Sequence, residues 1–104
     1  MSDRINSLKA MLADDPTNSF ARYGLAMEYT KSGDLETAVS EFRSLLSADP
    51  NYAAGYFHAG QTLERMGNVD EARDMYQRGI EVTHRTGDAH TRSELQAALD
   101  LLPI

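Results

Sequence analysis

Cysteine and tryptophan are absent from this 104-residue chain, and basic residues are few. Without a thiol the chain cannot form disulfides, use thiolate catalysis or build cysteine zinc sites. Its 10 Lys and Arg residues against 16 Asp and Glu residues leave a formal net charge of −6. This deficit of positive charge argues against broad electrostatic binding of nucleic acid or anionic lipid, so we expect neither a nucleic-acid nor a membrane partner.

Long apolar runs are absent as well. Residues 1–10 contain no uninterrupted apolar stretch, and no later segment approaches the roughly 18 apolar residues of a membrane span. We therefore expect a cytoplasmic protein. Val and Ile are scarce whereas Ala, Leu, Met, Glu, Arg and Gln are common, which favours helix over sheet. With 41% hydrophobic residues, the length predicts a single globular domain over residues 1–104.

The chain contains an internal repeat. A shift of 34 residues places Gly33 over Gly67 and keeps residue types matched on both sides of this position. Such a period is typical of helical repeat proteins. The shift pairs Leu25 with Ala59, Ala26 with Gly60, Tyr29 with Leu63, Ala38 with Ala72, Phe42 with Tyr76, and Leu46 with Ile80.

Each copy of the repeat predicts two helices joined by a tight turn. Gly33 and Gly67 supply the left-handed residue that ends a helix, and Asp34 and Asn68 follow as N-caps of the next helix. The second helix of each pair carries an apolar stripe that must be covered by packing. The stripes consist of Leu35, Ala38, Val39, Phe42, Leu45 and Leu46 in the first copy, and Val69, Ala72, Met75, Tyr76 and Ile80 in the second.

The period and spacing of these residues resemble the tetratricopeptide repeat (TPR). This resemblance implies an all-α, right-handed α-α superhelix, a TPR-like solenoid of about six antiparallel helices. Two positions depart from the family pattern, because Arg22 replaces the leading aromatic residue and His84 replaces the closing proline. The matching residues are Leu25, Ala26, Tyr29, Gly33, Ala38, Phe42 and Pro50, followed by Tyr56, Ala59, Gly60, Leu63, Gly67, Ala72 and Tyr76.

The two repeats are expected to lie between two further helices. An amphipathic segment that ends before Asp15-Pro16 predicts a half-repeat helix, and Thr86-Gly87-Asp88 predicts a helix stop followed by a new N-cap. The expected organisation is a half-repeat helix over 4–14, repeats over 17–50 and 51–84, and a capping helix over 88–102.

No pattern in the sequence indicates catalysis. Residues 55–62 are one residue away from a phosphate-binding loop, but Gln61 replaces the required lysine and the segment falls inside a predicted helix. His84 and His90 have neither the spacing of a helical ligand pair nor that of a zinc finger. We therefore predict a non-enzymatic protein without a cofactor or metal.

The resemblance implies that the first helices of successive repeats line a concave groove, which takes a peptide or a partner's helix. The function predicted in this way is a non-catalytic protein-protein interaction module. The family's groove positions correspond to Phe20, Tyr23, Met27, Thr30 and Lys31 in the first repeat, Ala54, Phe57, Gln61, Glu64 and Arg65 in the second, and Thr91, Arg92 and Leu95 in the capping helix if it continues the register.

Two interpretations of the groove's large apolar residues stay open. Phe20, Tyr23, Met27 and Phe57 form a hydrophobic strip for a partner, or they pack against the half-repeat and the cap. Lys31, Arg65 and Arg92 would favour an acidic peptide. The family's carboxylate clamp for chaperone tails is nevertheless a poor match, because its Lys and Asn positions are occupied here by Tyr23, Met27 and His58.

Self-association is the alternative function. The chain holds little more than two repeats, which is short for a solenoid. An apolar C-terminal end would allow a homodimer to form. The residues of this end are Leu101, Leu102 and Ile104.

Overall fold

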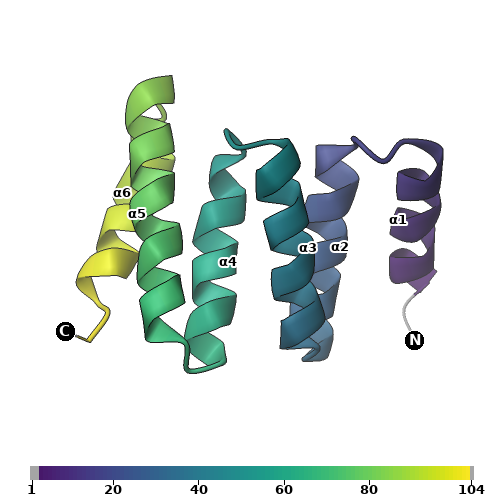
Figure 1. The fold of residues 1–104 in the computed structure, drawn as a ribbon, viewed down its shortest axis with the longest axis horizontal. Helices are drawn as coiled ribbons and strands as arrows, with labels where there is room; N and C mark the ends of the chain where they lie inside the picture. The colour runs from purple at the N-terminus through teal and green to yellow at the C-terminus, as the bar shows by residue number, and fades with distance from the viewer. Residues whose placement is uncertain (1–2, 104) are drawn as a thin grey trace.

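The computed structural model describes residues 3–103, and all of its regular secondary structure there is α-helical. This confirms the predicted all-α fold. The helices follow one another from α1 at one end of the molecule to α5 and α6 at the other, where α6 lies behind α5 in the view of Figure 1. They are α1 Asp3–Asp14, α2 Ser19–Ser32, α3 Leu35–Ala48, α4 Ala53–Arg65, α5 Val69–Thr86 and α6 Ala89–Asp100.

The predicted turns are formed by glycines in the left-handed region. Gly33, Gly67 and Gly87 have φ angles of 87°, 79° and 80°, which only glycine adopts at little cost. The Asn68 side chain accepts a hydrogen bond from the Glu71 backbone N–H and donates one to the Glu71 carboxylate. This reciprocal pair resembles a capping box, and it confirms the N-cap predicted for α5. The Asp34 and Asp88 carboxylates cap α3 and α6 by accepting hydrogen bonds from the backbone N–H groups of Thr37 and Thr91.

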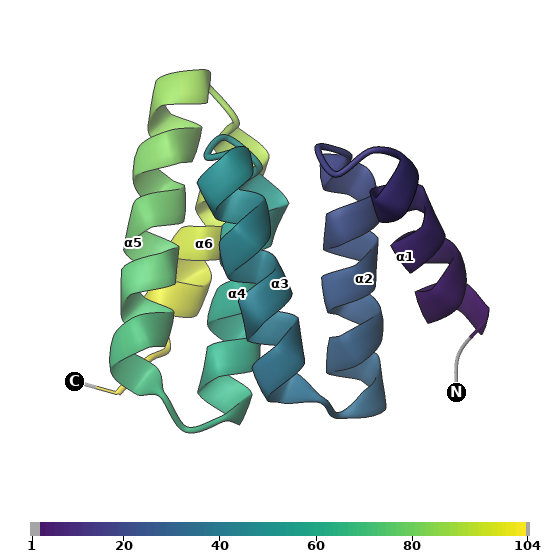
Figure 2. The same ribbon diagram turned by 45° about the vertical axis from the view of Figure 1, so that its right-hand side comes forward.

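The apolar residues are buried in two clusters. The larger one lies among α2 to α6 and includes Phe42 and Tyr76, which are fully buried. The smaller one joins α1 to α2 through Ile5 and Leu8. Because each helix packs on the next one along the chain (Figure 2), every amphipathic helix covers its apolar stripe with a neighbour.

Small residues allow the paired helices to approach closely. Gly60 of α4 lies against Tyr76 of α5, and a Cβ atom at Gly60 would stand 2.2 Å from the Tyr76 ring. The corresponding pair in the first repeat is Ala26 and Phe42, both fully buried. Both repeats therefore carry a small residue on the first helix and a fully buried aromatic residue on the second.

The capping helix does not continue the 34-residue register. Helix α3 ends at Ala48, ahead of Pro50, whereas α5 has no such proline and runs for 18 residues instead of 14. Helix α6 consequently starts at Ala89, two residues later than the register predicts from Ala53 of α4. Leu95 thereby takes the buried position that Ala59 has in α4.

The expectation that Leu95 lines the groove is therefore wrong. Its exposed fraction is 0%, and it packs against Gly79 of α5, where a Cβ atom would stand 2.9 Å from the Leu95 side chain. The two-residue shift in the start of α6 rotates the capping helix, so that Leu95 enters the core and other residues of α6 face α4.

Candidate partner-binding surface

Helices α2, α4 and α6, the first helix of each pair, form one side of the stack. The backbone of α2 contacts that of α4, and α4 contacts α6. Within residues 3–103, the backbones of α3 and α5 stay further apart. A stack whose elements are closer on one side curves toward that side, so we call the α2–α4–α6 side the concave face.

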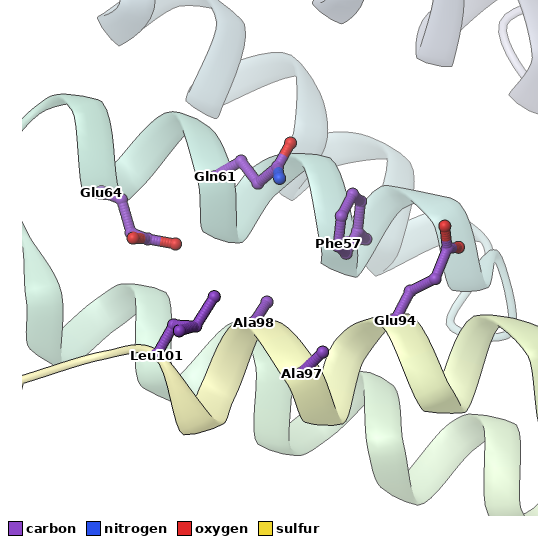
Figure 3. A pocket seen from close by; sticks show the side chains of 7 residues that line it. All are labelled: Phe57, Gln61, Glu64, Glu94, Ala97, Ala98 and Leu101. Atoms are coloured by element: carbon purple, nitrogen blue, oxygen red, sulfur yellow. The ribbon is translucent and has the colours of Figure 1, made fainter.

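A hollow of about 410 Å³ lies on the concave face between α4 and α6. Figure 3 shows its side chains facing one another from the two helices. Phe57, Gln61 and Glu64 were expected at the groove from the sequence. The residues from α6 were missed, because the expected register was two residues out. The sequence did hold a signal for this shift, because the predicted N-cap Asp88 lies 36 residues after Tyr52, the N-cap of α4, and not 34. The complete lining is Phe57, Gln61, Glu64, Glu94, Ala97, Ala98 and Leu101.

The apolar residues of α2 differ from one another in exposure. Phe20 is 65% exposed at the start of the helix. Tyr23 is half-buried, and its ring centroid lies 5.2 Å from that of Tyr52 and 5.8 Å from that of His58. Met27 is half-buried against the main core. Tyr23 and Met27 therefore contribute to the packing between α2 and α4, whereas Phe20 is open to solvent.

The basic residues named from the sequence do not line the hollow between α4 and α6. Arg65 donates from Nη1 to the backbone carbonyl of Thr30 at 3.3 Å, and Lys31 lies exposed near the end of α2. The Arg92 Nη1 atom is 3.0 Å from His84 Nδ1, so Arg92 faces the end of α5. These contacts leave the hollow without a basic side chain of its own.

The charged groups of the hollow are carboxylates. Glu64 accepts a hydrogen bond from the hydroxyl of Tyr76, and burial together with this carboxylate raises the pKa of Tyr76, which keeps the hydroxyl protonated. Glu94 lies 3.9 Å from His90 Nε2. Burial lowers the pKa of His58, and Glu94 opposes this effect only in part. The hollow is therefore acidic at neutral pH.

The segments that the sequence raised for phosphate or metal binding can be located in the fold. Residues 55–62 lie inside α4, where no loop is available to hold a phosphate. Among the described residues, no group of three His, Cys, Asp or Glu side chains lies close enough to hold a metal ion. No helix within residues 3–103 is long and apolar enough to cross a membrane.

Comparison with known proteins identifies the repeat. A family profile described as tetratricopeptide repeat matches residues 29–99. A TPR repeat-containing protein of Pseudomonas aeruginosa is 30% identical over 95 residues, which cover 91% of this chain and 90% of that protein. The crystal structure of a tetratricopeptide repeat domain protein from Salinibacter ruber is 39% identical, covers 79% of this chain and 91% of its own, and has a TM-score of 0.74.

A more distant structure shares the fold alone. It is the type III secretion translocator chaperone SycD of Yersinia enterocolitica, which is 18% identical and has a TM-score of 0.84 over 92% of this chain and 67% of its own. The matched profile, the related sequence and the repeated helix pairs all indicate the same architecture. The chain therefore belongs to the tetratricopeptide repeat family, whose fold serves as a scaffold for protein-protein interaction.

Proposed function

We propose that the chain is a non-catalytic interaction module that binds a peptide segment or a helix of a partner protein on its concave face. The hollow between α4 and α6 is the observation that supports this function best. At about 410 Å³ it has the size of a small ligand pocket, and it lies on the face formed by the first helices of the repeats. Helical partners dock on such faces through a few apolar side chains.

The chemistry of the hollow suits one apolar side chain of a partner. Phe57 is partly buried on the α4 side and lines the hollow, and Leu101 is 85% exposed on the α6 side. Ala97 and Ala98 keep the space between them open (Figure 3). Phe20 adds an exposed aromatic side chain on α2, so a longer partner segment has a second apolar contact on the same face.

The names of related proteins are consistent with this proposal. The Yersinia enterocolitica structure is that of a translocator chaperone. A cyanobacterial relative from Synechococcus elongatus, 33% identical over 78 residues, is named a photosystem I assembly protein. Both names describe proteins that act on other proteins, as a scaffold would.

A displayed library of random peptides tests the proposal directly. Peptides are selected on the unaltered protein and then measured against Ala97→Trp, which fills the hollow from an exposed position of α6. Ser44→Trp, at an exposed position of α3, is the matched control. We expect selected peptides to bind Ala97→Trp at least about tenfold more weakly and Ser44→Trp unchanged. Equal binding to all three proteins would place the interaction on another face.

Self-association through the C-terminal end is the alternative. Leu101 is exposed, but Leu102 is only 8% exposed and belongs to the main core, so it is not available to a second copy. Ile104 lies outside the described residues. Sedimentation of the unaltered protein beside Leu101→Glu separates the two functions, because a dimer held by this end would dissociate in the variant and an adaptor would sediment as before.

A further inference from the structure

The hollow between α4 and α6 has a charge pattern that specifies the chemistry of its partner. We infer that it binds a helical segment of a partner protein in which an apolar side chain lies between two basic side chains on one face. This inference rests on the proposed interaction function and adds to it the class of partner. It also reverses the sign of charge that Lys31, Arg65 and Arg92 suggest from the sequence.

The two carboxylates of the hollow have no arginine or lysine partner in the part of the chain that the structure describes. Among residues 3–103, neither Glu64 nor Glu94 forms an ion pair with Lys or Arg. The imidazole of His90, 3.9 Å from Glu94, is the only basic side chain that pairs with either of them in the described residues. Three glutamates elsewhere are paired with arginine, Glu28 with Arg4, Glu41 with Arg22 and Glu71 with Arg43. Of the glutamates on α2, α4 and α6, only the two at the hollow therefore have no arginine or lysine partner among residues 3–103.

Glu64 is also held in place. The buried hydroxyl of Tyr76 donates a hydrogen bond to its carboxylate, so the side chain loses little further freedom when a partner cation approaches. A carboxylate that is already oriented contributes more to binding than a mobile one, because less side-chain entropy is lost.

The two carboxylates lie at opposite ends of the hollow. Helices α4 and α6 run in the same direction (Figure 1), so Glu64 near the end of α4 and Glu94 near the start of α6 are separated along the trough (Figure 3). Phe57 and Leu101 each lie seven residues from the carboxylate on their own helix. Seven residues correspond to roughly 10 Å along a helix axis.

A partner helix could reach both carboxylates from one of its faces. Two basic side chains seven positions apart lie on the same face of a helix, about 10 Å from each other, and a residue midway between them faces the same way. Such a helix would place one cation near Glu64, the other near Glu94 and an apolar side chain between them, over Ala98. Acidic side chains at the same two positions would be repelled.

Three synthetic peptides and direct binding measurements test the inference. The first is an alanine-rich helical peptide with two Arg residues seven positions apart and two adjacent Leu residues midway between them. The second has the same composition but carries both Arg residues on the face opposite to Leu. The third has Glu in place of both Arg residues. We expect the first peptide to bind about tenfold more tightly than either of the others at low ionic strength, because it alone can place both Arg residues beside the carboxylates while Leu enters the hollow.

Matched protein variants locate the charge. The double variant Glu64→Gln, Glu94→Gln keeps an acceptor for Tyr76 and removes both negative charges from the hollow. The control Glu36→Gln, Glu81→Gln removes the same net charge from exposed positions of α3 and α5. We expect the first peptide to bind the hollow variant about tenfold more weakly than the unaltered protein and the control within about twofold.

Each other outcome overturns the inference. It fails if the unaltered protein binds none of the three peptides, prefers the Glu peptide, or does not distinguish the two Arg peptides. It also fails if both double variants weaken binding equally, since net charge alone would then be responsible. Finally, it fails if the unaltered protein is a dimer that Ala97→Trp dissociates, because a second copy of this chain would then occupy the hollow. The library selection with Ala97→Trp still decides the proposed interaction function in each of these cases.

Discussion

Replacing Gly60 by alanine should destabilise the protein even though alanine is the better helix former. The added Cβ atom would stand 2.2, 2.6 and 2.7 Å from three atoms of the Tyr76 ring. These separations are well below van der Waals contact. Tyr76 is fully buried and its hydroxyl is bonded to Glu64, so the ring cannot withdraw without losing packing and that hydrogen bond.

Two opposing effects set the magnitude. Overpacking of a core costs about 1–3 kcal/mol, and alanine is about 1 kcal/mol more favourable than glycine inside a helix. Because the contacts at Gly60 are so short, we expect the upper part of the overpacking range and a net loss of about 1–2 kcal/mol in the free energy of unfolding. For a domain of this size such a loss lowers Tm by roughly 5–15 °C.

Urea denaturation followed by circular dichroism measures this loss. Gly24→Ala is the matched control, because its Cβ atom would meet the flexible Leu8 side chain at 3.2 Å, and we expect it to be neutral or stabilising. Adding Tyr76→Phe to Gly60→Ala should recover part of the loss, since the first repeat already packs Ala26 with Phe42. The reasoning is refuted if Gly60→Ala is as stable as the unaltered protein, or if Gly24→Ala is destabilised equally.

Three further perturbations follow from the same structure. Ala72→Leu should lower Tm, because Ala72 is fully buried between the helices of the second repeat and overpacking costs about 1–3 kcal/mol; an unchanged melting curve would contradict the helix pairing. Gly67→Ala should lower the free energy of unfolding by about 1 kcal/mol, because its φ of 79° is unfavourable for alanine, and denaturant titration would show equal stability if that turn were not required. Burial lowers the pKa of His58, so below about pH 6.5 the unfolded chain binds more protons at this residue than the folded chain, and stability should fall as pH falls toward the folded-state pKa. His58→Gln should reduce the difference in urea midpoint between about pH 7.5 and 5.5, and an identical difference in both proteins would show that His58 is not responsible.

Signals that depend on near neighbours or on a fixed period were sufficient to predict the fold. Gly33 and Gly67 end their helices because a left-handed residue is needed there, and Asn68 caps the next helix through a side chain three residues away from its partner. The stripe from Ala38 to Leu46 predicted which residues are buried, since a helix that repeats every 3.6 residues presents them to one side. Because the pattern repeats after 34 residues, the structure predicted for the first helix pair also applied to the second.

The surface available to a partner depended on the exact length of each helix, because every added residue rotates the helices that follow. The sequence by itself determined an all-α repeat and its helix ends, because caps, periodicity and the repeat depend only on the spacing of residues along the chain. Only the tertiary structure decided that α6 starts two residues beyond the register, that Leu95 enters the core, and that Glu64 and Glu94 lie at opposite ends of one hollow. A shift of two residues turns a helix by about 200°, so the side chains that α6 presents to α4 follow from packing and not from the repeat alone.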